Sequence, residues 1–170
     1  IGQKYLLWHI PIAFIAIKFI SNTALKDTMY YELATLTLPF GTAGQAAANV
    51  HAFASAPDAQ GELLGCWFTD IGVLNQMIVL RGFATLDALA AERERTQKSA
   101  SPFGCGEIYQ ALEQHSYQGF PWMKPVRPSA ESGISGPVYE IRTYGIKTGG
   151  VQPTIDLWEQ YVPPRDKPSP

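Results

Sequence analysis

The sequence predicts an α+β domain with the element order strand, helix, strand, strand, helix, strand, followed by the start of a second copy of that domain. Apolar and β-branched residues form four strand-like runs, and two further segments carry apolar residues at helical spacing. Residues 31–36 (Tyr-Glu-Leu-Ala-Thr-Leu) also return 108 positions later as residues 139–144 (Tyr-Glu-Ile-Arg-Thr-Tyr), and Gly41 returns as Gly149. A repeat of that length corresponds to a domain rather than to a solenoid unit.

The repeat and the composition together predict the domain organisation. We expect a first domain over residues 29–124, a linker over 125–137 and the truncated start of a second domain over 138–170. The linker is rich in proline, glycine and serine. The content of 46% apolar and 16% charged residues is typical of a globular protein.

The charge balance excludes one class of partner. The chain contains fifteen acidic and thirteen basic residues, and no cluster of Lys or Arg indicates a nucleic-acid-binding surface. We therefore expect no nucleic-acid partner. Cys66 and Cys105 lie in different segments. Two cysteines in a chain of this size are typical of reduced thiols, which favours a reducing, cytoplasmic compartment.

Residues 1–28 are treated apart from the predicted fold. Residues 5–20 are apolar but contain His9, Pro11 and Lys18, so the run is short and interrupted for a membrane span. Three interpretations remain open: foreign or linker sequence, a membrane or export segment, and a packing helix. Apart from this segment, we expect no membrane association.

The first strand and helix follow from alternation and spacing. The strand covers residues 30–38, with Glu32 on one face together with Ala34, Leu36 and Leu38, and with Tyr31, Leu33 and Thr35 on the other face. Pro39 and Gly41 end this strand, and Thr42 is expected to cap a helix over 43–56. The apolar stripe of this helix consists of Ala46, Val50 and Phe53.

The next elements are two strands over residues 63–68 and 75–83, joined by a loop. A helix capped by Thr85 follows, and its buried edge is predicted to consist of Leu86, Leu89 and Ala90. Residues 92–95 (Glu-Arg-Glu-Arg) are expected to form its solvated face. The remaining predicted elements are a loop over 99–106, a helical turn over 107–112 and a fourth strand over 114–123.

This order is that of the ferredoxin-like βαββαβ module, in which both helices cover one face of the sheet. Both faces of the third strand are apolar, because Met77, Val79 and Phe83 alternate with Ile78 and Leu80. The face without helices therefore needs a partner, either a second domain of the same chain or a second chain. We expect a fragment that begins at Met29 to associate or aggregate.

The second copy is predicted to open with a strand from residue 138 that ends at residues 148–150 (Thr-Gly-Gly). Pro153 suits the first turn of a helix. The apolar stripe of that helix would consist of Thr154, Leu157, Trp158 and Tyr161.

With these residues in view, the chain resembles the NIPSNAP family of dimeric α/β barrel proteins. The resemblance is carried by residues 138–144 and 146–149, together with Leu64-Gly65, Phe68, Thr69, Ile71-Gly72 and Leu74-Asn75-Gln76. It implies a paired ferredoxin-like barrel, as a homo-oligomer or through pairing of domains within one chain. The chain departs from the family pattern at Ala34, where the second copy has Arg142, and at Arg81, where a bulky aromatic residue is expected.

Two buried-strand carboxylates are the best candidates for binding residues. Glu32 and Glu140 interrupt strands that are otherwise apolar and β-branched, and Arg142 lies on the same face as Glu140. Buried carboxylates without partners are costly, so each is either a structural ion pair or a ligand contact. We consider the structural interpretation the stronger one.

Four further residues could contribute to a binding site. His51 lies at the edge of the first helix stripe and is more simply a surface histidine, because no acid or nucleophile is spaced to orient it. Asn75 and Gln76 could bind a ligand or tie down the preceding loop. Trp67 could line a pocket or fill the core. The cysteines and histidines show no metal-ligand spacing, and no phosphate-binding loop is present, so we expect no metal and no cofactor.

Two classes of function remain. The first is a binding or interaction module for a small molecule or a protein, which the lack of a catalytic motif favours. The second is a small cofactor-independent enzyme, monooxygenase-like or isomerase-like, that uses the cleft of the barrel. A closed interior pocket lined by Trp67, His51 and an unpaired carboxylate would favour catalysis, whereas a filled interior would favour binding.

Overall fold

The computed structural model describes residues 29–126 and 139–161. The chain divides into a larger unit, Ile15–Pro128, and a smaller unit made of Ile1–Phe14 and Ser129–Pro170. Each unit is described by itself. None of the helices in the two described ranges combines the length and the hydropathy that a membrane span requires. The predictions for residues 1–28 lie outside the described residues.

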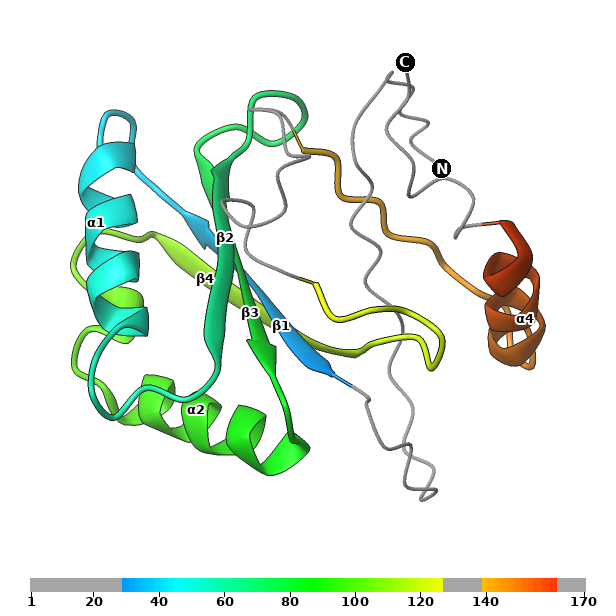
Figure 1. The fold of residues 1–170 in the computed structure, drawn as a ribbon. Coiled ribbons are helices and arrows are strands. Elements are labelled where there is room, and N and C mark those ends of the chain that lie inside the picture. Colours follow the sequence, from blue (N-terminus) through cyan, green and yellow to red (C-terminus); the bar gives the residue numbers. More distant parts are fainter. Residues whose placement is uncertain (1–28, 127–138, 162–170) are drawn as a thin grey trace, which may run out of the picture. The chain divides into compact units, whose positions relative to one another are not determined.

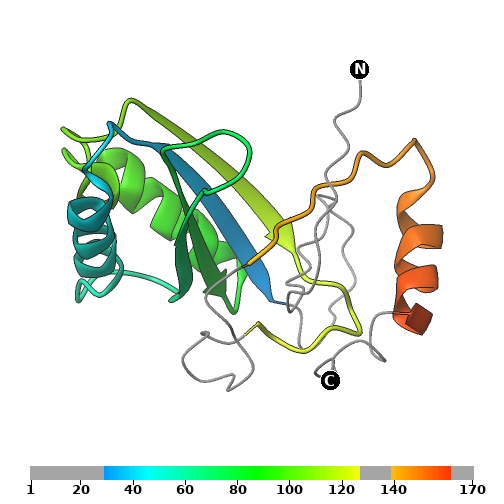
Figure 2. The ribbon, with the colours of Figure 1, turned by 90° about the horizontal axis from the view of Figure 1, so that it is seen from above.

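The larger unit has the ferredoxin-like fold that the sequence predicts. Its elements are β1 (Tyr30–Thr37), α1 (Ala43–Ala54), β2 (Glu62–Phe68), β3 (Gln76–Phe83), α2 (Leu86–Lys98), the short 3-10 helix η1 (Pro102–Gly104) and β4 (Ala111–Gln118). The strands form one antiparallel sheet in the order β2-β3-β1-β4. Both α-helices lie on the same side of this sheet (Figure 2).

The predicted faces of the central strands are confirmed. The helix-covered side of the sheet buries the side chains Ala34, Leu36, Leu38, Met77 and Val79 against Ala46 and Val50 of α1. We call the opposite face the helix-free face, because no helix in the described part of the larger unit covers it. It carries a second apolar cluster, which we call the sheet-face cluster: Tyr31, Leu33, Leu64 and Leu80. Val126 packs against this cluster, and its N–H donates a hydrogen bond of 3.1 Å to Tyr31 Oη.

The prediction for the end of the larger unit was wrong in two respects. β4 covers Ala111–Gln118 rather than residues 114–123, and the helical turn predicted over 107–112 lies over 105–109, where the Ile108 and Tyr109 N–H groups donate to Cys105 O at 2.8 Å and 3.0 Å. The Gln110 N–H donates a hydrogen bond of 2.8 Å to Thr37 O, which brings the chain alongside β1 before Ala111. Pairing with β1 therefore sets the start of this strand, because its own alternating exposed residues give no apolar signal.

The predicted ends of α2 are only partly right. Thr85 caps the helix as expected, because its Oγ1 accepts a hydrogen bond from the Ala88 N–H. The predicted buried edge is confirmed for Leu89 and wrong for Leu86, which is 50% exposed, and for Ala90, which is exposed. The buried residues of this helix are Leu89, Glu92 and Thr96.

At the start of α1, the prediction that the Thr42 side chain caps the helix is wrong, because its hydroxyl donates instead to Pro39 O at 2.8 Å.

The smaller unit contains α4 (Val151–Tyr161) and no strand among its described residues 139–161. The predicted strand is therefore wrong for residues 139–147. A strand requires a neighbouring strand to satisfy its backbone groups, and residues 139–161 provide none. The stripe of α4 is not buried, since Leu157 and Tyr161 are more than half exposed.

The turn that precedes α4 nevertheless repeats the turn that precedes α1. Gly41 and Gly149 adopt φ values of 86° and 78°, which favour glycine. The Thr42 N–H donates to Pro39 O, and 108 positions later the Gly150 N–H donates to Lys147 O. Both helices start at equivalent positions of the repeat, Ala43 and Val151. The turn and helix start thus share a local geometry, while the duplicated domain as a whole remains a prediction.

Candidate functional site

Four charged side chains meet between the sheet and α2, and we call them the ion-pair network: Glu32, Arg81, Glu92 and Arg95. β1 and β3 place Glu32 directly opposite Arg81 in the strand register. α2 supplies the other two residues from one turn of helix. The Glu32 and Glu92 side chains are fully buried, and the Arg81 side chain is 2% exposed.

Every carboxylate oxygen of this network accepts a hydrogen bond. Arg81 Nε donates to Glu32 Oε2 at 3.0 Å, and the terminal nitrogens of Arg81 pair with Glu32 and with Glu92. Gln114 Nε2 donates to Glu32 Oε1 at 3.0 Å. Arg95 donates to both oxygens of Glu92, at 2.8 Å and 2.7 Å, and the Gln60 N–H donates to Glu92 Oε2 at 3.0 Å.

Aromatic rings enclose the two guanidinium groups. Arg81 Cζ lies 4.7 Å from the ring centroid of Phe103, and Arg95 Cζ lies 3.9 Å from that of Phe53. The two rings also contact each other, with centroids 5.7 Å apart. Phe103 adopts a positive φ of 55°, which is uncommon for a residue with a side chain. Phe103 therefore combines a left-handed backbone conformation with a ring that packs against the Arg81 guanidinium.

This arrangement supports a structural role for Glu32. A buried carboxylate that is fully hydrogen-bonded and paired with a buried guanidinium has neither the free oxygen nor the access that proton transfer to a substrate requires. The predicted solvated face over residues 92–95 is wrong for Glu92, which is fully buried. A run of alternating charges is typical of an exposed helix face. Glu92 departs from this expectation because it pairs with Arg81, which lies on β3.

The network makes the stability of the larger unit depend on pH. Burial alone raises the pKa of Glu92, but the hydrogen bonds from Arg95 and the Gln60 amide, with the charges of Arg81 and Arg95, lower this pKa below its ordinary value. A lowered pKa stabilises the fold above the ordinary value of 4.5, and this contribution is lost as the pH falls through the folded-state pKa.

We therefore expect Glu92→Gln to remove part of the acid sensitivity of the fold. The variant should be clearly less stable than the wild type at neutral pH, because the pairing with both arginines is lost. The gap in unfolding free energy should shrink as the pH falls below about 4.5. Urea unfolding at a series of pH values measures this gap. A gap that stays constant down to the acid limit would contradict the coupling.

The predicted pair in the smaller unit forms an ion pair. Arg142 Nε donates to Glu140 Oε1 at 2.7 Å, and Arg142 Nη2 donates to Glu140 Oε2 at 2.8 Å. The hydrogen bonds from Arg142 to Glu140 and Tyr144 raise the pKa of the guanidinium, which stays charged. The Arg142 side chain is 41% exposed. An exposed pair of this kind contributes little to stability.

Asn75 and Gln76 act through their backbone at the start of β3. Asn75 has a positive φ of 58° and accepts a hydrogen bond from the Leu38 N–H at 2.8 Å. Gln76 pairs with Thr69 in both directions, because its N–H donates to Thr69 Oγ1 at 3.2 Å and its carbonyl accepts from the Thr69 N–H at 3.0 Å. These contacts favour the loop-closing interpretation over ligand binding.

Trp67 and His51 lie on different sides of the larger unit. Trp67 packs against the sheet-face cluster and its indole lies directly over Gly65, where a Cβ atom would come within 2.1 Å of the ring. His51 is exposed on α1, on the helix side of the sheet. The structure does not bring the two together, so the closed pocket lined by both, which would favour catalysis, is not formed.

The two thiols suit neither nucleophilic chemistry nor metal binding. Burial, and secondarily the neighbouring Cys105, raises the pKa of the Cys66 thiol to about 11. Burial also raises the pKa of Cys105, whose side chain is fully buried. Both cysteines are free thiols, as predicted, and remain protonated at neutral pH. Within residues 29–126 and 139–161, no three metal-ligating side chains lie close enough to hold a metal ion.

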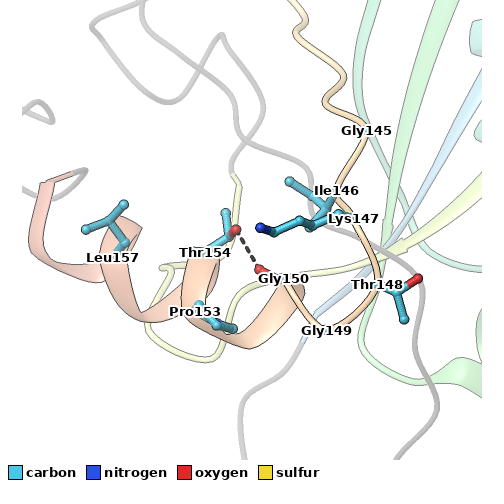
Figure 3. A pocket seen from close by; sticks show the side chains of 9 residues that line it. All are labelled: Gly145, Ile146, Lys147, Thr148, Gly149, Gly150, Pro153, Thr154 and Leu157. Atoms are coloured by element: carbon cyan, nitrogen blue, oxygen red, sulfur yellow. Dashed lines mark hydrogen bonds between the residues drawn. The ribbon is translucent and has the colours of Figure 1, made fainter.

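The smaller unit has one described hollow, of about 610 Å³, beside the start of α4 (Figure 3). Its lining residues are Gly145, Ile146, Lys147, Thr148, Gly149, Gly150, Pro153, Thr154 and Leu157. The Gly150 N–H is already bonded to Lys147 O, and Thr154 bonds Gly150 O through both its N–H and its hydroxyl. The turn therefore satisfies its own polar groups, and we assign no ligand to this hollow.

Arg81, Glu92 and Arg95 are the interacting residues that the sequence analysis missed. Arg81 could have been recognised, because it is a charged residue within an apolar strand, as Glu32 is. A βαββαβ order makes the first and third strands neighbours, so the two charges were candidates for direct pairing. The positions of Glu92 and Arg95 depend on how α2 docks and carry no such signal.

Comparison with known proteins finds one family model that matches part of the chain. Residues 31–113 match the family model described as NIPSNAP. No curated protein matches the chain.

Three solved structures illustrate the similarity. A NIPSNAP family protein from Agrobacterium tumefaciens is 24% identical, with coverage of 52% of this chain and 90% of that one and a TM-score of 0.42. A second protein of that family from the same organism, of unknown function, is 26% identical, with coverages of 59% and 91% and a TM-score of 0.41. An uncharacterised NIPSNAP-like domain protein from Burkholderia xenovorans is 22% identical, with coverages of 59% and 92% and a TM-score of 0.43.

Proposed function

We propose that this chain, whose residues 31–113 carry a NIPSNAP domain, is a binding and interaction module that works as a paired α/β barrel. The partner is a second domain of the same fold, supplied by another copy of the chain or by the second repeat. The space between the two sheets would then be the site for a small-molecule ligand. The proposal rests on one observation, the apolar helix-free face of the sheet.

The sheet-face cluster supports this proposal because it makes both sides of the central strands apolar. Tyr31, Leu33, Leu64 and Leu80 form its centre, and Met29, Trp67, Ile78, Tyr117 and Val126 surround it. Two sheets that pack face to face bury such surfaces against each other. The four central side chains are each 9% exposed or less, so the partner sheet would contact the half-buried side chains that surround them.

The ion-pair network also favours binding over catalysis. The buried carboxylates of Glu32 and Glu92 are neutralised by arginines and are held by hydrogen bonds. A general acid or base needs a displaced pKa together with access to a substrate, and these two groups lack the access. Trp67, on the opposite face, offers an aromatic wall to a ligand without adding acid–base chemistry.

We expect Ile78→Lys to weaken the association of the full chain by ~10-fold or more, because it places a charge at the centre of the proposed interface. Ile78 lies on the helix-free face and is half-buried, so the substitution leaves the helix-covered core intact. Light scattering coupled to size-exclusion chromatography across a micromolar concentration range measures the change. Circular dichroism checks that the variant is folded.

Leu86→Lys is the matched control, since Leu86 is also an apolar residue but is 50% exposed at the start of α2. It should associate as the wild type does. Pairing through the helix-free face would be refuted by a wild-type chain that stays monomeric throughout the range. Equal association of the Ile78→Lys variant and the wild type would refute it as well.

A further inference from the structure

One end of the larger unit presents an exposed apolar surface that the sheet pairing does not use. Five large apolar side chains at this end are exposed, and together we call them the apolar tip: Phe40, Phe68, Ile71, Val73 and Leu74. Phe40 is 92% exposed, and the three loop residues are between 56% and 67% exposed. They come from the β1–α1 turn and from the end of β2 with the following loop, which are far apart in the sequence.

The turn that carries Phe40 is closed by two hydrogen bonds. The Thr42 N–H donates to Pro39 O at 3.3 Å, and the Thr42 hydroxyl donates to the same oxygen at 2.8 Å. Gly41 takes the positive φ that the third position of such a turn requires. An aromatic side chain held in solvent by a fixed turn loses little conformational entropy on binding.

The loop that carries the aliphatic residues is fixed at its base. The two-way pairing of Thr69 with Gln76 closes it, and Gly72 and Asn75 shape it with φ values of 97° and 58°. The hydrogen bond from the Leu38 N–H to Asn75 O joins this loop to the end of β1. The loop and the Phe40 turn therefore lie at the same end of the sheet (Figure 1).

The fold itself does not require Phe40. In the repeated turn before α4, the equivalent position is occupied by Thr148, while the glycine conformation and the closing hydrogen bond are the same. A polar residue therefore satisfies this turn geometry. An exposed phenylalanine that the local structure does not demand is typical of a contact residue.

The charges around the apolar tip indicate the chemistry of its partner. No Lys or Arg occurs in residues 29–80 or in residues 99–123. Asp70 lies within the loop, and Glu107 lies three residues before Gln110, whose N–H donates to the last residue of β1; both carboxylates are exposed. An acidic rim without cations disfavours an anionic lipid surface and complements Lys or Arg on a partner.

We propose that the apolar tip docks an amphipathic polypeptide segment of a partner protein, in which apolar anchor residues are flanked by lysines or arginines. Phe40 and the loop side chains contact the anchors, and Asp70 and Glu107 face the basic flanks. The proposal is independent of the sheet pairing, because it uses the end of the sheet rather than its helix-free face.

The test measures binding of a synthetic amphipathic Leu/Lys helix of about 14 residues to the full chain. A Leu/Glu peptide of the same pattern is the control for charge. We expect the basic peptide to bind the wild type, and we expect Phe40→Thr or Ile71→Ser with Val73→Ser to weaken binding ~10-fold or more. Leu86→Ser, which removes an exposed apolar residue at the opposite end of β3, should change binding less than ~2-fold.

Amide chemical shifts locate the contact. Peptide addition should shift the amide signals of Gly41 and Gly72 at the apolar tip and leave Gly61, at the other end of β2, unchanged. Failure of the basic peptide to bind, equal binding of the acidic peptide, or an equal loss in Leu86→Ser would overturn the proposal. Binding to phosphatidylcholine vesicles that Phe40→Thr abolishes, without peptide binding, would assign the surface to lipid instead.

A third outcome separates this proposal from the sheet pairing. If Phe40→Thr abolishes self-association and the peptide does not bind, the apolar tip is an interface between copies of this chain, and the partner proposed here is wrong. Ile78→Lys, which tests the sheet pairing, should leave peptide binding unchanged. The two proposals can thus fail separately.

Discussion

Replacing Arg81 with Met is expected to destabilise the larger unit by ~3–5 kcal/mol, because the substitution leaves two buried carboxylates without the cation that they share. Met preserves most of the length and the apolar stem of the arginine, so the loss is mainly one of charge and hydrogen bonds. Glu92 keeps Arg95 as a partner, whereas Glu32 keeps only Gln114 at hydrogen-bonding distance and Arg93 at 3.6 Å.

Urea unfolding followed by circular dichroism measures this loss, and Lys98→Met supplies the control. Lys98 pairs with Glu94 on the exposed side of α2, so its removal should cost less than ~1 kcal/mol. A third variant, Arg81→Met with Glu32→Leu and Glu92→Leu, removes the whole buried group of charges and should recover much of the stability. An Arg81→Met variant as stable as Lys98→Met would show that the buried pairs do not hold α2 on the sheet.

Truncation of Phe103 to Ala is expected to cost ~3–5 kcal/mol, as for other fully buried aromatic residues. The ring is 1% exposed, contacts Phe53 and covers the guanidinium of Arg81. Its loss leaves a cavity beside a buried cation, so both packing and the cation–π contact are removed.

The left-handed backbone at Phe103 adds a sharper comparison. Alanine retains a Cβ at a φ of 55°, whereas glycine adopts this conformation without the steric cost of ~1 kcal/mol. Phe103→Gly should therefore be no less stable than Phe103→Ala, although glycine is the less stable choice at most positions. Thermal unfolding of the two variants decides this. A glycine variant that is clearly the less stable would contradict the assigned backbone strain.

The fold was predictable wherever the sequence of a strand is a nearly continuous run of apolar and β-branched residues that is buried on both faces. β1 and β3 carry such patterns, and their bounds agree with the expected ones to within about one residue. β4 is an edge strand in which Glu113, Gln114 and His115 interrupt any apolar alternation. The register of β4 is set by its pairing with β1, and the local sequence of β4 does not predict that pairing.

The same distinction explains the candidate site. A charge such as that of Glu32 stands out within an apolar strand, so its burial was predictable, and its partner Arg81 lies opposite it in the register. Glu92 and Arg95 form part of a charge run that resembles a solvated helix face. Glu92 is buried and its neighbour Glu94 is exposed because of the way α2 docks on the sheet. The local sequence does not indicate this docking.

The ion-pair network has a consequence for the order in which the chain folds. Glu32 takes its partners from 49 and 82 positions further along the chain, on two other strands. Contacts between such distant segments form slowly, because a long loop must close before any energy is gained. The charges can leave water only after β1, β3 and β4 have assembled. Docking of α2 is therefore expected to be a late event in folding.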